Sequence, residues 1–128
     1  MTTKRFFSGS SWEPKVGYAR AVRKGNFIAV SGTAPVGDDG KIAGLNDPFT
    51  QTQRCFVIIQ KALKELGGDL SDIVRTRIFV ADMNHWEDIG RAHAQAVGAF
   101  PPATSLVQVA MIDPHILVEI EADAIVGE

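Results

Sequence analysis

Three carboxylates spaced two residues apart are the side chains of this sequence best suited to chemistry. Within residues 116–124, strand alternation places Glu119, Glu121 and Asp123 on one face and apolar side chains on the other. Carboxylates in such a row repel one another unless cations face them. The pattern therefore predicts either a lattice of ion pairs or a carboxylate that lines a pocket between subunits and positions or activates water. Alternation alone does not say which carboxylate that would be.

Arginines with the same two-residue spacing occur in two other segments. Arg75 and Arg77 lie in a β-branched run at residues 73–80, and Arg20 follows Tyr18 by two residues. An arginine pairs with a carboxylate through charge-assisted hydrogen bonds, whether that carboxylate belongs to the protein or to a ligand. Each of these arginines is thus a candidate either for the lattice or for the pocket.

The first half of the chain is expected to form a hairpin and a helix. Residues 18–22 and 27–30 read as two strands joined by a tight turn, and the Gly- and Asp-rich residues 36–46 read as a loop. Asp47 has the residue type of a helix N-cap, and the proline after it suits the first turn. Apolar residues then recur at helical spacing until a pair of glycines ends the helix. They are Phe56, Ile59, Leu63 and Leu66.

The second half is expected to contribute a helix between strands. Residues 73–80 read as a strand, and Asn84 with Glu87 resembles a capping box for a helix that ends near Gly98. Two more strands are predicted at about 103–110 and 116–125, with a further short one at 4–7. The order of elements is ββ-α-β-α-ββ, an α+β fold in which two helices cover one face of the sheet. The other face needs a partner, which predicts an oligomer.

Bulk composition excludes several classes of protein. A chain of 128 residues with net charge −2 is expected to form one domain, residues 1–128, without the basic surface that nucleic-acid binding requires. The single cysteine, Cys55, rules out an intrachain disulfide and a cysteine-based zinc site. No signal peptide or membrane-spanning run is evident. We expect a cytoplasmic protein with no membrane or nucleic-acid partner, no cofactor and no metal.

Three stretches of the chain resemble the RidA/YjgF family in order and spacing. They are Phe27-Ile28-Ala29-Val30-Ser31-Gly32, residues 73–84 with Phe79-Val80 and Asp82-Met83-Asn84, and Pro102-Ala103-Thr104-Ser105 followed by Val118-Glu119-Ile120-Glu121-Ala122. The resemblance implies a chorismate-mutase-like fold and a homotrimer whose sheets face inward. It also implies three small-molecule pockets between neighbouring subunits.

The resemblance further implies an activity and its residues. Active members of the family hydrolyse enamines and imines such as 2-aminoacrylate to a 2-oxo acid and ammonia. In them a glutamate orients the attacking water, a tyrosine and a serine line the pocket, and the arginine of a Pro-Ala-Arg-Ser motif grips the substrate carboxylate. The glutamate matches Glu119, the tyrosine Tyr18 and the serine Ser31, whereas the arginine matches Thr104.

Threonine in place of that arginine limits how far the activity transfers. Thr104 offers one neutral hydrogen bond, and losing two bonds to a carboxylate weakens binding by at least about ten- to a hundredfold. Either the substrate is bound through a group other than this carboxylate, or Arg20 or Arg91 supplies the cation that binds the carboxylate. Arg91 alternatively lies on a solvated helix face. His93 on that helix is a candidate acid or base near neutral pH, or an ordinary packed residue.

Two classes of function remain open. The first is a hydrolase or deaminase that acts on an imine or enamine other than 2-aminoacrylate, for example in a 2-aminomuconate-like deamination. The second is a trimer that binds a small metabolite without turnover. RNA cleavage, which is attributed to relatives, is disfavoured by the net charge of −2.

Overall fold

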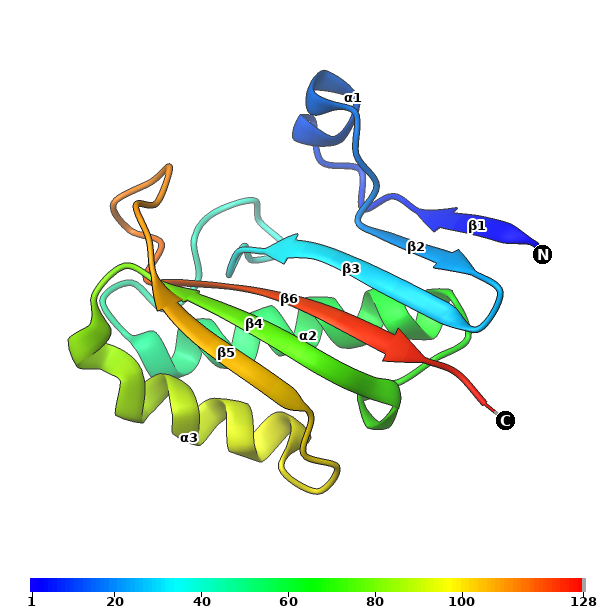
Figure 1. Ribbon diagram of the computed structural model, residues 1–128. Coiled ribbons are helices and arrows are strands. Elements are labelled where there is room, and N and C mark those ends of the chain that lie inside the picture. Colours follow the sequence, from blue (N-terminus) through cyan, green and yellow to red (C-terminus); the bar gives the residue numbers. More distant parts are fainter. Residues whose placement is uncertain (128) are drawn as a thin grey trace.

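The computed structural model describes residues 1–127, which form one six-stranded sheet with helices packed on it (Figure 1). The order of strands in the sheet is β1-β2-β3-β6-β4-β5, and β4 and β5 are the only parallel pair among these strands. The strands are β1 (Thr3–Phe6), β2 (Ala21–Lys24), β3 (Phe27–Thr33), β4 (Ile73–Val80), β5 (Ala103–Gln108) and β6 (Val118–Ile125). The helices are α1 (Trp12–Val16), α2 (Pro48–Glu65) and α3 (Trp86–Val97), with 3-10 turns at Leu70–Asp72 and Met83–His85.

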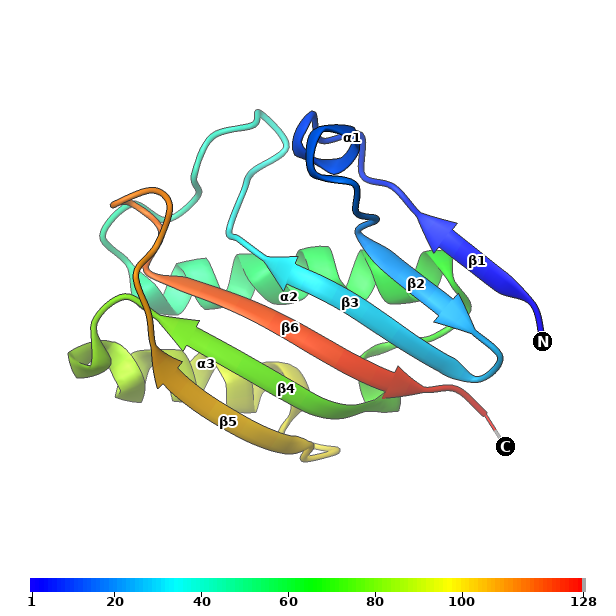
Figure 2. The same cartoon turned by 45° about the horizontal axis from the view of Figure 1, so that its top comes forward.

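Helices α2 and α3 lie side by side on one face of the sheet (Figures 1 and 2). Their apolar stripes pack on the inward residues of β3, β4 and β6 to form the core. The opposite face carries no helix in the described chain, and we call it the open face. The predicted α+β architecture, with two helices on one face of a sheet, is therefore confirmed.

Helix α2 begins and ends where its sequence predicts. The Asp47 side chain accepts a hydrogen bond from the Thr50 backbone N–H, and Pro48 occupies the first turn. The helix ends at Glu65, and Gly67 then adopts a positive φ of 88°. Glycine reaches that conformation without steric cost, which explains its place at the helix end.

The beginning of α3 differs from the prediction. Asp82 caps the 3-10 turn Met83–His85 by accepting a hydrogen bond from the Asn84 backbone N–H. Helix α3 then starts at Trp86 without a side-chain cap. The expected capping box of Asn84 and Glu87 was wrong, because Asn84 lies within the 3-10 turn and His85 takes the N-cap position.

The N-terminal third also contains an element that the sequence pattern did not indicate. The five-residue helix α1 precedes Gly17, and β2 starts only at Ala21, so residues 18–20 form an irregular segment between them. Helix α1 is short because Gly17 terminates it with a φ of 87°. Tyr18 and Arg20 consequently lie on a connection rather than within the predicted strand.

The central strand β6 shows the predicted alternation. Val118, Ile120, Ala122 and Ala124 are completely buried against the helices. The intervening residues Glu119, Glu121 and Asp123 are half-buried on the open face. The buried side chain of Gln51 fixes the start of β6, since it accepts from the Leu117 backbone N–H and donates to the carbonyls of Gly44 and His115.

Candidate functional site

Two of the three carboxylates on β6 form ion pairs with one arginine. The Arg77 guanidinium lies 3.2 Å from Glu121 and 3.2 Å from Asp123. Strand register accounts for this, since Arg77 is directly opposite Glu121, and Arg75 is opposite Asp123. The lattice interpretation therefore holds for Glu121 and Asp123.

Glu119 is the exception in the row. Its cross-strand neighbour on β4 is Phe79 rather than an arginine. Within residues 1–127 its carboxylate forms no ion pair and no hydrogen bond. Burial raises the pKa of Glu119 above its usual range, and the positive charge of Arg20 partly opposes this rise. A carboxylate that is half-buried and unpaired remains available to a ligand or to water.

Arg20 lies beside this carboxylate and is held by the backbone of β3. Its Nη2 donates to the Gly32 carbonyl, and its guanidinium lies 5.9 Å from the centre of the Tyr18 ring. Its Nε is buried without a hydrogen-bond partner among the described residues. Burial lowers the pKa of Arg20, while the charges of Tyr18, Glu13 and Glu119 act in the opposite direction. Because a guanidinium is protonated at any physiological pH, it remains a cation here.

An irregularity in β3 allows these groups to meet. The pairing of β3 with β6 shifts register between Val30 and Thr33, so Ser31 and Gly32 together face a single residue of β6. Ser31 Oγ donates to the Ala19 carbonyl over 2.7 Å, and the Ser31 backbone N–H donates to the Arg20 carbonyl. Through these bonds the irregular part of β3 holds the segment that carries Tyr18 and Arg20. The structure thus brings together four predicted residues, which we call the Glu119 cluster. They are Tyr18, Arg20, Ser31 and Glu119.

Glu13 supports the cluster from helix α1. Its side chain is 2% exposed, and its carboxylate accepts from the backbone N–H groups of Ser8 and Gly9 and from the Ser8 hydroxyl. Its backbone carbonyl accepts from the N–H groups of Gly17 and Tyr18. A hollow of about 240 Å³ beside this helix is lined by Arg5, Phe7, Glu13 and Tyr18, among others. Glu13 therefore connects residues 8–9 to the segment that begins at Tyr18. No periodic pattern in the sequence indicated this role of Glu13.

Thr104 and His93 lie on the helix-covered side of the sheet. Thr104 Oγ1 is 2.8 Å from Thr76 Oγ1, which is in turn 2.9 Å from His93 Nε2. His93 also packs edge-on against Phe56, with ring centres 5.6 Å apart. Burial lowers the pKa of His93, which favours the neutral ring. Within one chain, therefore, Thr104 and His93 are separated from Glu119 by the sheet.

Arg91 belongs to the outer layer of helices. It pairs with Asp88 at 2.9 Å, and its guanidinium lies 4.6 Å from the centre of the Phe49 ring. Of the two arginines considered as replacement cations, the structure brings Arg20 to Glu119 and places Arg91 elsewhere in the same chain.

The model of the family described as Endoribonuclease L-PSP matches residues 9–126. The chain belongs to this family. Its fold is that of the YjgF/YER057c/UK114 protein Rv2704 from Mycobacterium tuberculosis, with a TM-score of 0.88, 45% identity and coverage of 98% of this chain and 100% of that one. The resemblance to the RidA/YjgF family, and the fold that it implied, are confirmed.

Two curated relatives extend the comparison within the L-PSP family. Protein SCO2049 of Streptomyces coelicolor is 35% identical over 97% of this chain and 92% of its own. The protein named 3-aminoacrylate deaminase RutC of Acinetobacter baylyi is 29% identical over 87% of this chain and 88% of its own. Each similarity covers most of the domain.

Phe79 and Gly32 are neighbours of Glu119 that the sequence did not assign to the site. Phe79 follows Arg75 and Arg77 at the same two-residue spacing and so lies on the same face of β4. An apolar residue after two arginines on one strand face is the feature of the sequence that could have pointed to it. Gly32 carried no signal, because its role depends on the irregularity in β3. Cys55 is buried below the sheet and burial raises the pKa of its thiol, which disfavours a nucleophilic thiolate in this L-PSP domain.

Two negative findings concern other kinds of site. Among residues 1–127, no group of three or more His, Cys, Asp and Glu side chains could hold a metal ion. None of the helices in this part of the chain combines the length and apolar character that a membrane crossing requires.

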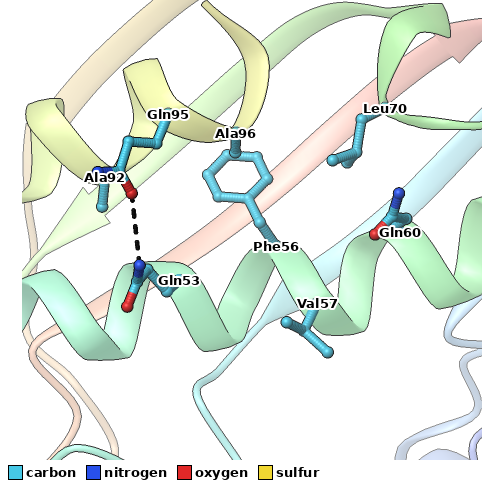
Figure 3. A pocket seen from close by; sticks show the side chains of 8 residues that line it. All are labelled: Gln53, Phe56, Val57, Gln60, Leu70, Ala92, Gln95 and Ala96. Atoms are coloured by element: carbon cyan, nitrogen blue, oxygen red, sulfur yellow. Dashed lines mark hydrogen bonds between the residues drawn. The ribbon is translucent and has the colours of Figure 1, made fainter.

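A second hollow of about 230 Å³ lies between α2 and α3, where Gln53 donates to Gln95 beside Phe56 (Figure 3). It contains no charged side chain and is distant in the fold from the open face.

Proposed function

We propose that this L-PSP family protein hydrolyses a small imine or enamine at the Glu119 cluster. The single observation that carries the proposal is the Glu119 carboxylate, which is unpaired in a row where both neighbouring carboxylates are paired. A carboxylate with a raised pKa is suited to accept a proton from water, since its basicity is closer to neutral pH. Glu119 is thus the group that orients and activates the attacking water.

The chemistry needs no cofactor. The imine reacts as its iminium form, which takes its proton from solvent, and water adds to the carbon of the C=N bond while one water proton passes to Glu119. The carbinolamine that results accepts this proton on its nitrogen, and its C–N bond then breaks as the hydroxyl proton is lost to solvent, which gives a carbonyl compound and ammonia. An enamine enters the same route after protonation at carbon converts it to the imine. Glu119 returns its proton to the departing nitrogen, so it is unchanged after the reaction.

Arg20 supplies the cation that orients the substrate. Its Nη2 donates to the Gly32 carbonyl, and the Tyr18 ring lies near the guanidinium. A substrate with a carboxylate near Arg20 and its C=N carbon near Glu119 satisfies both charged groups. The RutC relative is named for 3-aminoacrylate, an enamine that bears a carboxylate, and this supports the same substrate class. The substrate is expected to differ from 2-aminoacrylate, because Thr104 replaces the arginine of the family motif.

Binding without turnover is the second candidate, and the position of Thr104 favours it. The hydroxyl of Thr104 is directed to Thr76 and His93, so it does not replace a cation on the open face of its own chain. A site with one substrate-facing cation can hold a small metabolite without aligning it for attack. RNA cleavage has less support, because Arg77 is neutralised by two carboxylates and the net charge is −2.

A decay assay separates these functions. An amino-acid oxidase generates 2-iminopropanoate and a panel of other imino acids, and the rate at which each imine disappears is followed with and without the protein. We expect little or no acceleration with 2-iminopropanoate and clear acceleration with at least one other carboxylated imine. Saturable binding of such compounds with no accelerated decay of any of them would instead establish the binding function.

The pockets are proposed to form between the subunits of a homotrimer. On the open face, near the carboxylates of β6, Phe27 is 44% exposed and Ile125 is 52% exposed. An uncovered sheet face of this kind is stabilised by burial against other copies. A homotrimer with inward-facing sheets covers all three open faces at once. Light scattering coupled to gel filtration is expected to give three times the chain mass of 13.8 kDa at micromolar concentration. A stable monomer would remove the pocket between subunits from the proposal.

A further inference from the structure

The open face of β4 carries a row of side chains that faces the carboxylate row of β6. Arg75, Arg77 and Phe79 are opposite Asp123, Glu121 and Glu119, in that order. Arg77 neutralises two of the three carboxylates. At the third place the row of arginines is replaced by an aromatic ring, and it is there that the carboxylate is unpaired.

We propose that Phe79 is a positioning residue that keeps Glu119 free of an ion pair. Directly opposite residues of antiparallel strands have Cβ atoms about 4.5–5.5 Å apart, close enough for an arginine at position 79 to reach Glu119. Phenylalanine offers no charge and no hydrogen bond at that place, and an apolar neighbour disfavours the ionised form of a carboxyl group. The inference rests on the proposed role of Glu119 and identifies what maintains it.

Within the described chain, none of the other titratable groups near Glu119 forms an ion pair with it. Arg20, from the segment before β2, donates a hydrogen bond to the Gly32 carbonyl and forms no ion pair with Glu119 within the described chain. Glu121, two residues along β6, is bound by Arg77. Cys55, from α2 beneath the sheet, is held uncharged because burial raises its pKa. Glu119 is the cross-strand neighbour of position 79, so it is the carboxylate that an arginine there would reach first.

Gly32 completes the same arrangement from the β3 side. A Cβ at this position would lie 3.3 Å from Glu119 Oε1, and no other atom of the described chain outside residues 31–33 would lie within 4 Å of it. The absence of a side chain at Gly32 thus leaves room for the carboxylate, and Phe79 is its cross-strand neighbour on β4. Neither residue can form an ion pair with Glu119.

The test is the titration of Glu119 in the free protein, followed by carbon-13 NMR of its side-chain carboxyl group. In Phe79→Arg we expect the pKa of Glu119 to fall by about one unit or more, because an opposite charge close by favours the ionised form. In the matched variant Phe79→Leu, an apolar side chain remains and the pKa is expected to stay raised. Equal pKa values in these two variants would overturn the proposal.

A second comparison covers the case in which Phe79→Arg does not fold. Phe79→Gln introduces no charge but admits water, so the pKa of Glu119 is expected to fall below that in Phe79→Leu. The same value in both variants would again contradict the role of Phe79. These titrations need no substrate, and the imine assay needs no variant. Failure of the proposed function and failure of this inference are therefore seen separately.

Discussion

Glu119→Gln is expected to reduce the turnover of an accepted imine by about 10²- to 10⁴-fold, the usual contribution of a general acid or base. Glutamine keeps the shape of the side chain but cannot accept a proton from water. The initial rate of imine decay at saturating substrate measures the effect. The matched variant is Glu121→Gln, which changes the next carboxylate of the same row, one that is bound to Arg77 and not placed in the site.

Thermal melts of these variants add an independent readout. The raised pKa of Glu119 means that the fold favours the protonated carboxyl, so ionisation of Glu119 at neutral pH opposes folding. Glu119→Gln is therefore expected to leave the melting temperature at pH 7 unchanged or to raise it. Glu121→Gln and Asp123→Asn each remove a partner of Arg77 and are expected to lower it. Equal losses of stability in all three, with turnover intact in Glu119→Gln, would assign Glu119 to the ion-pair lattice.

Arg20→Gln is expected to raise KM about ten- to a hundredfold for a carboxylated imine. A hydrogen bond to a charged group contributes about 1.5–3 kcal/mol, and about 1.4 kcal/mol corresponds to a factor of ten in affinity. The effect on kcat should be smaller, because Glu119 remains in place to activate water. Steady-state kinetics on the best substrate of the imine panel separates the two constants.

Arg20→Lys serves as the control for this prediction. Lysine retains the charge but not the planar fork, so its KM is expected to lie between those of the native protein and Arg20→Gln. Arg91→Gln tests the other arginine, which is engaged by Asp88 and Phe49 on the helical layer. A rise in KM for Arg91→Gln with none for Arg20→Gln would transfer the role of the cation to Arg91.

Much of the fold was predictable because its elements depend on local periodicity. The helix at Pro48–Glu65 follows from an N-cap and an apolar stripe, and the alternation in Val118–Ile125 fixes which side chains are buried. Helix α1 was not predictable in this way. Its five residues are too few for a periodic signal, and the buried Glu13 holds it through bonds to Ser8 and Gly9. Such bonds leave no repeat in the sequence.

The site was less predictable because it depends on long-range register. Alternation gave three equivalent carboxylates, and only the resemblance selected Glu119. The pairing of β4 with β6 distinguishes them physically, since it sets Phe79 opposite Glu119 and Arg77 opposite Glu121. The parallel pairing of β4 with β5 likewise directs Thr104 toward Thr76, and no segment read by itself reveals that pairing.

The central position of β6 has a consequence for biosynthesis. This strand joins β3 to β4, although about forty residues separate β3 from β4 and a further stretch of similar length separates β4 from β6. A nascent chain that has not yet exposed residues 118–125 lacks the strand that, within residues 1–127, pairs with both β3 and β4. Its strands β3 and β4 then present unpaired backbone edges to other chains. The complete sheet can therefore form only after this segment has left the ribosome. Because Glu119 lies on the same strand, the candidate site forms in the step that completes the sheet.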